Sequence, residues 1–199
     1  MTQNIQGNYY DKHNSKNPVV KILMKNFHAV LNKTIKATGA KTIIDAGCGE
    51  GHTTKIIKDA NPEISIEGIE IGRETAEKAR ALNPGIKFEE GTIYEIKRSN
   101  ESYDLAISTE VLEHLEEPLK GLNELKRVSK KFVLVTVPNE PLWRITNIAR
   151  LSYIKQFGNT PGHINHWSKR KLKKFLEPHF KNIKIKKALL WLVALCEKN

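Results

Sequence analysis

The sequence predicts an α/β fold in which helices cover both faces of a mostly parallel sheet. From residue 41 onwards, short apolar runs rich in β-branched residues alternate with segments of helical periodicity, a pattern typical of parallel sheets. The first run ends in an acid and a glycine-rich turn, which suits a buried strand that leads into a helix. The last two runs, residues 180–187 and 189–197, have almost no loop between them, so we expect them to pair antiparallel.

The other elements follow from periodicity and from residues that start or stop helices. Pro18 opens a helix that Gly39 closes, because proline fits the first helical turn and glycine the position after the last. We expect further strands at residues 41–46, 64–70, 86–90, 103–109 and 132–137. We expect further helices at residues 53–59, 73–82, 118–129 and 168–177, with a helical turn at 111–115.

We expect the 199 residues to form one domain, because this length and a 39% hydrophobic content suffice for one core. Residues 1–38 comprise a polar arm and the first helix. Residues 138–166 carry few regular signals and are too long for a simple connection. They are therefore expected to form an insertion on the substrate side.

Positive charge is concentrated in the last two-fifths of the chain. Residues 1–120 contain 16 Lys/Arg and 18 Asp/Glu, whereas residues 121–199 contain 17 and 4, and the formal net charge is +11. A lysine-rich solvated surface would account for this distribution. So would an anionic substrate, an acidic membrane surface or RNA as a partner.

The sequence indicates a cytoplasmic location. Its first residues, Met-Thr-Gln-Asn, lack the charged and then apolar pattern of a signal peptide. The longest apolar run, residues 188–196, is too short to span a bilayer, so no transmembrane segment is expected. The two cysteines lie far apart in the sequence, which argues against a disulfide framework and for a reducing compartment. The oligomeric state is left open.

The segment Thr42–His52 carries the clearest functional signal, because Gly47, Gly49 and Gly51 follow the first strand at every second position. Such a turn lets the backbone approach a bound ligand, which the N–H groups at the start of the next helix then face. Glu70 ends the second strand, where a carboxylate is placed to accept both ribose hydroxyls of a nucleoside. The alternative for Glu70 is a surface acid at a strand end.

The segment Asp45–Gly51, Glu70 and the final strand pair resemble the class I S-adenosylmethionine-dependent methyltransferases, over about residues 40–197. The resemblance implies a Rossmann-like, seven-stranded sheet in the order 3-2-1-4-5-7-6, with strand seven antiparallel. It implies S-adenosylmethionine as cofactor, with the three glycines on its methionine part, Glu70 on its ribose and Ile71 on its adenine. Four further residues are expected at the cofactor: Asp45, Cys48, Ile93 and Ser108.

One position departs from the family pattern. Where the family usually has an acid near the adenine amine, just after the glycine that ends strand three, this chain has Gly91-Thr92. Thr92 is expected either to hydrogen-bond adenine through its hydroxyl or to be a simple loop residue.

The segment Ser108–Leu115 holds the candidate catalytic residues. If Glu110 opens a helical turn, Glu113 and His114 follow at i+3 and i+4, so the three side chains share one face. Two carboxylates and an imidazole suit a hard divalent cation such as Mg²⁺ or Mn²⁺, which would lower the pKa of a substrate hydroxyl. Without a metal, His114 would be a general base or a structural partner of the turn, and Glu113 would be solvated.

The same segment resembles quinone-type O-methyltransferases and small-RNA 2′-O-methyltransferases. In the RNA enzymes, two glutamates and a histidine of this pattern join a later histidine on a metal. His163 and His166 are the candidates here, with Ile164-Asn165 between them where the RNA enzymes have an acid. The alternative is that the two histidines cap the following basic helix and pack the insertion.

The insertion and the residue that follows it are rich in aromatic side chains. These form either a small core under a long loop or a wall for the acceptor substrate. The polar arm resembles the N-terminal lid of this family, which would exclude water from the sulfonium. The aromatic residues are Trp143, Tyr153, Phe157 and Trp167, and those of the arm are Tyr9 and Tyr10, with His13 nearby.

The sequence therefore predicts an enzyme that methylates an oxygen of a small or lipid-linked acceptor, with Glu110 and His114 at the reacting atoms. A second hypothesis is methylation of RNA at a 2′-oxygen, favoured by the basic C-terminal portion. A third is a protein that binds S-adenosylmethionine without catalysis.

Overall fold

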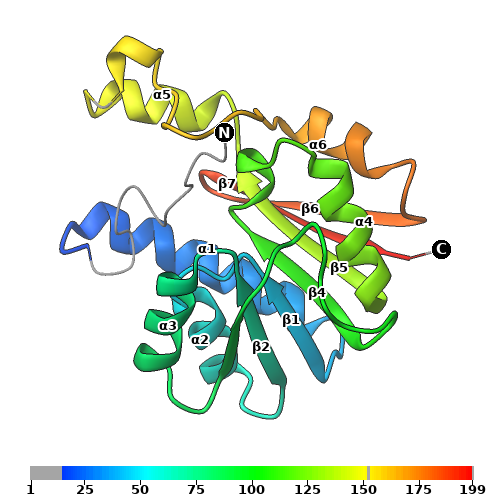
Figure 1. Cartoon of the computed structure of the whole chain (residues 1–199). Coiled ribbons are helices and arrows are strands. Elements are labelled where there is room, and N and C mark those ends of the chain that lie inside the picture. The colour runs from blue at the N-terminus through cyan, green and yellow to red at the C-terminus, as the bar shows by residue number, and fades with distance from the viewer. Residues whose placement is uncertain (1–14, 152, 199) are drawn as a thin grey trace.

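The computed structural model describes residues 15–151 and 153–198, so the predicted arm with Tyr9, Tyr10 and His13 lies outside the described residues. Seven strands form one sheet in the order β3-β2-β1-β4-β5-β7-β6, in which β7 runs in the opposite direction to the other six (Figure 1). The predicted fold class and strand order are confirmed. The strands are β1 Thr42–Ala46, β2 Ser65–Glu70, β3 Lys87–Glu90, β4 Tyr103–Thr109, β5 Ser129–Pro138, β6 Asn182–Ala188 and β7 Trp191–Glu197.

Helices cover both faces of the sheet (Figure 1). The neighbouring residues Ile43 and Ile44 on β1 belong to different cores, because side chains alternate between the faces of a strand. Ile43 packs in the core that includes residues of α1 and α2, and Ile44 in the core that includes residues of α4 and α6. The helices are α1 Pro18–Lys36, α2 His52–Ala60, α3 Arg73–Leu82, α4 Pro118–Val128, α5 Leu142–Ala149 and α6 Lys169–Leu176.

Two stretches differ from the sequence-based prediction. Leu112–His114 form a 3-10 helix, η1, and Glu110 precedes it with φ 60°. The prediction that Glu110, Glu113 and His114 share one helical face is therefore wrong, because Glu110 lies outside the helical turn. The insertion is also more regular than expected, since it contains α5 and a second 3-10 helix, η2 Ile154–Gln156.

The sheet topology gathers the candidate residues at one edge. β1 lies between β2 and β4, so the strand order reverses direction at this point. In open α/β sheets, ligands bind outside the carboxyl ends of the strands at such a switch point. The glycine turn follows β1, Glu70 ends β2, and Glu110 follows β4. All three therefore belong to the edge where this topology favours a binding site.

Candidate active site

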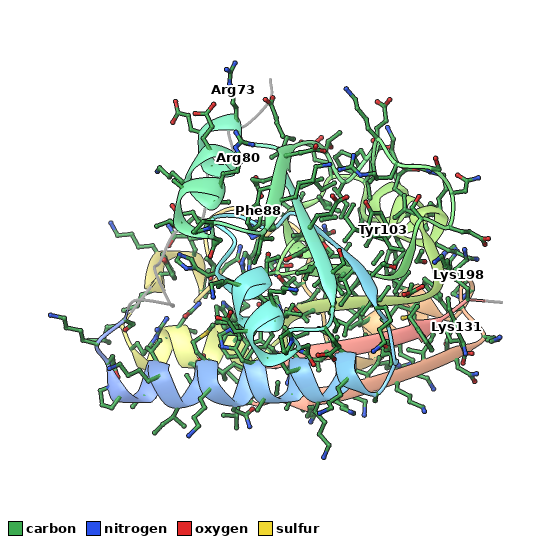
Figure 2. All side chains as sticks on the ribbon, turned by 90° about the horizontal axis from the view of Figure 1, so that it is seen from below. Arg73, Arg80, Phe88, Tyr103, Lys131 and Lys198 are labelled. Carbon is green, nitrogen blue, oxygen red and sulfur yellow. The ribbon has the colours of Figure 1, made fainter. Side chains whose placement is uncertain are left out.

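The glycine turn after β1 is shaped by Gly47, Gly49 and Gly51. Their φ angles are 82°, 57° and 78°, a left-handed conformation that L side chains rarely adopt. A Cβ atom at Gly47 would lie 2.5 Å from Val111 Cγ2, and one at Gly51 would lie 2.6 Å from Cζ of Phe88, which Figure 2 labels. A Cβ atom at Gly49 would meet no described atom within 4 Å. The outer glycines thus allow close packing, and Gly49 borders open space.

Glu70 connects this turn to the end of β2. Its Oε2 accepts a hydrogen bond from the Gly49 N–H at 2.9 Å, and its Oε1 accepts one from the Gly72 N–H at 3.2 Å. The Gly47 and Cys48 N–H groups donate to the Ile69 carbonyl oxygen at 2.8 and 3.1 Å. Each carboxylate oxygen has a second lone pair. Glu70 therefore shapes the turn and keeps acceptor capacity for a ligand.

Asp45 is fully buried at the end of β1. It accepts a 2.6 Å hydrogen bond from the Thr54 hydroxyl, which connects the strand to α2. Burial raises the pKa of Asp45 to about 7, an effect that the nearby Glu70 charge reinforces and the Thr54 hydrogen bond opposes. Burial also raises the pKa of the neighbouring Cys48 thiol, so this thiol stays protonated.

The other residues predicted at the cofactor have different surroundings. Ile71 follows β2 and is 63% exposed, which leaves an apolar surface beside Glu70. The Thr92 hydroxyl accepts a 3.2 Å hydrogen bond from the Tyr94 N–H, as a loop residue would. Ile93 is buried in the core. The Ser108 hydroxyl donates to the Ala46 carbonyl oxygen at 2.8 Å, which joins the end of β4 to that of β1.

Glu110 is directed towards β7. Its N–H donates to the Thr136 carbonyl oxygen at 3.1 Å, and its Oε2 accepts a 2.7 Å hydrogen bond from Nε1 of Trp191. Trp191 is the first residue of β7, and it pairs with Pro138 at the end of β5. Glu110 therefore contacts an aromatic residue of the hairpin that β6 and β7 form.

The insertion returns to the sheet beside η1. The Ile164 and Asn165 N–H groups donate to the Glu113 carbonyl oxygen at 2.9 and 3.0 Å. The Asn165 side-chain amide donates to the carbonyl oxygens of Leu112 and Leu115 at 3.1 and 2.6 Å. A carboxylate at position 165 could not donate these bonds. Asn165 therefore joins the insertion to η1 and brings His163, two residues earlier, close to it.

Three ionisable side chains meet at this junction. Glu113, His114 and His163 each have one potential ligand atom, and these atoms lie within 4.8 Å of one another. Glu113 is 1% exposed, His163 is 8% exposed, and the two imidazole rings meet edge to face with centroids 4.9 Å apart. One carboxylate and two imidazoles form a donor set that suits a divalent transition metal.

Glu110 and His166 are also predicted as metal ligands. Within the described residues, neither belongs to the group of close ligand atoms on Glu113, His114 and His163. Burial lowers the pKa of His166, and the positive charges of Arg144 and Lys171 lower it further. Neither histidine provides the cap of α6, because the Ser168 hydroxyl accepts the hydrogen bond from the Lys171 N–H.

The aromatic residues of this region divide into separate groups. Trp143 stacks on His163 with ring centroids 6.4 Å apart, and it meets Trp191 edge to face at 5.4 Å. Trp167 packs instead on Phe175 in the core beneath α6. Phe157 is 76% exposed and belongs to neither group. Trp143, Trp167 and Phe157 therefore form neither one core nor one wall.

Sequence reasoning missed Asn165 and Trp191. The spacing of His163 and His166 indicates the two histidines as candidate ligands, whereas Asn165 differs from the sequence pattern only by replacing an acid. Trp191 reaches Glu110 through the pairing of β7 with β5, across 81 positions of sequence. No local pattern indicates such a contact.

Comparison with known proteins adds to this geometry. A family model described as a methyltransferase domain matches residues 19–179. An uncharacterized methyltransferase of Schizosaccharomyces pombe is 33% identical over 99 residues, which is 44% of this chain and 36% of that protein. Malonyl-[acyl-carrier protein] O-methyltransferase of Halalkalibacterium halodurans is 27% identical over 92 residues, 43% of this chain and 34% of that protein. The chain thus spans about a third of the length of these curated relatives.

The fold is similar to that of a solved methyltransferase. Magnesium protoporphyrin IX methyltransferase (ChlM) from Synechocystis PCC 6803, determined with bound SAH, superimposes with a TM-score of 0.68. The identity is 16%, and the match covers 93% of this chain and 89% of that one. At this identity the likeness concerns the fold. Because the family model covers most of the sequence, this chain belongs to the methyltransferase domain family.

Proposed function

We propose that this protein transfers a methyl group from S-adenosylmethionine to an oxygen of a small or lipid-linked acceptor. The observation that carries the proposal is the contact between the glycine turn and the segment that follows β4. Val111 lies against Gly47, and Glu113 and His114 follow Val111 within three residues. A methyl donor on the glycine turn would therefore lie close to the buried Glu113 and the half-buried His114. Family membership and the O-methyltransferase relative support this reaction.

The residues on the donor side fit S-adenosylmethionine. We assign its methionine part to the glycine turn, where Gly49 borders open space. We assign its ribose to Glu70, whose oxygens keep acceptor capacity, and its adenine to the exposed side chain of Ile71. The cofactor supplies an activated methyl group. The protein's own residues then have to position the acceptor, exclude water and remove a proton.

A metal ion fits the cluster of Glu113, His114 and His163. With two imidazoles and one carboxylate, the donor set favours Mn²⁺ or another transition metal over Mg²⁺, which prefers oxygen ligands. Such an ion would lower the pKa of an acceptor hydroxyl. Without an ion, the same geometry makes His114 the candidate general base, because its Nδ1 contacts the Gly162 carbonyl oxygen and leaves Nε2 as the acceptor.

RNA is the second candidate acceptor, and one observation favours it. Residues 141–176 contain 8 Lys/Arg and no Asp/Glu. Such a segment attracts phosphate groups, and its binding to a polyanion would weaken steeply with salt. For either acceptor, we place the protein in the cytoplasm, in keeping with its two free cysteines.

Thermal unfolding tests the assignment of the methyl donor. S-adenosylmethionine and its demethylated product should each raise the melting temperature, because a ligand that binds only the folded state stabilises it. Glu70→Ala should abolish the shift. Glu74→Ala, which changes an exposed carboxylate on α3, is the matched control and should keep it. Absence of any shift in the wild-type protein would refute the donor assignment.

Methyl transfer to defined acceptors tests the proposed reaction and the class of its acceptor. Catechol-type and quinol-type hydroxyl compounds and short RNAs would be incubated with S-adenosylmethionine labelled in its methyl group, with Mn²⁺, with Mg²⁺ or with a chelator. Labelled small hydroxyl compounds would support the proposal, and label in RNA alone would support the second candidate. If the donor binds but no acceptor of either class is labelled, O-methylation of these classes is rejected and the binding-protein hypothesis gains support.

A further inference from the structure

The insertion presents a ridge of exposed apolar side chains. Leu151 is 80% exposed, Phe157 76% and Ile145 57%, and the whole ridge lies within sixteen residues of sequence. Large apolar side chains that gather in one exposed patch mark an interaction surface, whereas scattered ones do not. We use the name apolar ridge for Leu142, Ile145, Ile148, Leu151, Ile154 and Phe157.

Helix α5 has the reverse of the usual helical pattern. Its exposed side carries Leu142, Ile145 and Ile148 at i, i+3 and i+6, whereas its buried side carries Trp143 and the polar Asn147. A surface helix normally buries its apolar stripe and exposes its polar residues. The reversed pattern indicates that the apolar side of α5 is made for contact with something other than this chain's own core.

Polar contacts between α5 and the segment that follows it fix this orientation. The Asn147 side-chain amide donates to the Gly158 carbonyl oxygen at 2.9 Å, and the Arg144 Nε donates to the Phe157 carbonyl oxygen at 3.0 Å. A Cβ atom at Gly158 would lie 2.3 Å from the Arg144 carbonyl oxygen, so only glycine permits this packing. The segment after α5 is thus folded back on the helix, and Leu142 and Ile145 lie on the side of α5 that stays exposed.

Positive charge surrounds the ridge. Arg150 and Lys155 are exposed within it, and residues 141–176 contain no acidic residue. The exposed lysines and arginine of α6 continue the same charge. Figure 1 shows α5 projecting beyond the carboxyl end of β5, on the same side of the molecule as α6. A surface with apolar and basic side chains and no acids complements a partner whose outer layer carries negative charge and whose interior is apolar.

We propose that the apolar ridge docks on the surface of an anionic lipid bilayer. Helix α5 has 8 residues, which is too short to span a bilayer. With apolar and basic side chains exposed together, it would lie in the headgroup region. Within the described residues no helix is both long and apolar enough to cross a membrane. RNA fits the ridge less well, because aliphatic side chains give no contact to phosphates and stack poorly on bases. The proposal does not depend on methyl transfer; with a lipid-linked acceptor, it would bring the protein to its substrate.

Vesicle sedimentation of the full chain tests the proposal. The probes are vesicles of phosphatidylglycerol and phosphatidylcholine, and vesicles of phosphatidylcholine alone. We expect wild-type protein to sediment with the anionic vesicles. Leu151→Asp and Phe157→Asp should each weaken binding at least about tenfold, since each removes an exposed apolar side chain that docking would bury in the bilayer. Leu82→Asp adds the same charge at an exposed leucine of α3 and should bind as wild type does. Lys155→Gln should weaken binding at low salt and have little effect at high salt.

The melting temperature and its shift by the demethylated cofactor should be the same in the ridge variants and the wild type, because the substituted side chains are exposed. These readouts separate loss of docking from loss of fold or of cofactor binding. The proposal is overturned if wild-type protein does not sediment with anionic vesicles, or if the ridge variants sediment as well as it does. It is also overturned if wild-type protein is a dimer that Leu151→Asp dissociates, since a second copy would then cover the ridge.

Discussion

The Nδ1 atom of His114 lies 2.9 Å from the carbonyl oxygen of Gly162. Because a carbonyl oxygen only accepts hydrogen bonds, Nδ1 carries the proton in the neutral ring and Nε2 presents its lone pair. The insertion therefore fixes the tautomer of a histidine that follows β4. The arrangement is the one by which backbone carbonyls orient metal-ligating or basic histidines, and it makes His114 the central residue of the candidate site.

Single substitutions of histidines test which of them are ligands of the cluster of Glu113, His114 and His163. His114→Ala and His163→Ala should each reduce Mn²⁺ binding and methyl transfer by about 10- to 100-fold or more, because each removes one of three close ligand atoms. His166→Ala is the control and should keep both, since its ring lies outside the group. Isothermal titration with Mn²⁺ and the acceptor assay measure the two effects. Equal losses in all three variants would contradict the assignment of ligands.

Asn165→Asp tests the link between the insertion and η1. The carboxylate cannot donate to the Leu112 and Leu115 carbonyl oxygens, so two hydrogen bonds are lost and two acceptors are left without them. We expect a loss of about 1–3 kcal/mol in the free energy of unfolding, measured by urea denaturation. Asn123→Asp, at an exposed position of α4, should change the stability little. An unchanged stability in Asn165→Asp would show that these bonds do not support the junction.

The sequence predicted most of the fold because its local signals agree with the final structure. Pro18 is the first residue of α1, the β-branched runs coincide with strands, and the glycine turn leads from β1 to α2. Gly39 lies beyond the end of α1, which stops at Lys36 with Ala37 as its cap, so the helix closes earlier than predicted. Helix α5 is not predicted because it is short: Leu142, Ile145 and Ile148 recur at helical spacing, but 8 residues are fewer than the window over which such periodicity is distinctive.

The candidate site was predicted less completely, for physical reasons. The pattern of acids and histidine around residues 110–114 indicated a chemical site, but not that Glu110 adopts φ 60° and meets Trp191. That contact depends on the pairing of β5 with β7. The position of His163 depends on hydrogen bonds between residues about 50 positions apart. Such long-range contacts are set by tertiary structure, which local propensity does not encode.

Alanine substitutions in the glycine turn should separate binding from folding. Gly49→Ala places a methyl group where the space is open, so it should weaken binding of the demethylated cofactor about tenfold or more, while costing about 1 kcal/mol of stability from the left-handed backbone. Gly47→Ala collides with Val111 and should destabilise the protein more. Calorimetric titration and thermal unfolding measure the two quantities. The reverse order of stabilities would rule out this account of the turn.

The pH dependence of stability should reveal the buried carboxyl of Asp45. Its pKa is about 7 in the folded protein, against an ordinary value of 3.8, so between these pH values the folded state binds more protons than the unfolded state. Stability from this group is therefore present below about pH 4 and is lost as the pH rises towards 7. Asp45→Asn can still accept the Thr54 hydrogen bond but does not titrate. The difference in unfolding free energy between the two proteins should change in this window; a constant difference would refute the shift.

Trp191→Phe tests the contact between β7 and Glu110. The phenyl ring keeps most of the apolar contacts with Phe27 and Trp143 but removes the N–H that donates to Glu110. We expect a loss of about 1–3 kcal/mol in the free energy of unfolding, because a half-buried carboxylate loses a charge-assisted hydrogen bond. Trp167→Phe is the matched control, since the buried Nε1 of Trp167 has no hydrogen-bond partner among the described residues. Its loss should be smaller, and equal losses measured by urea denaturation would mean that ring size, and not the Glu110 contact, determines the effect.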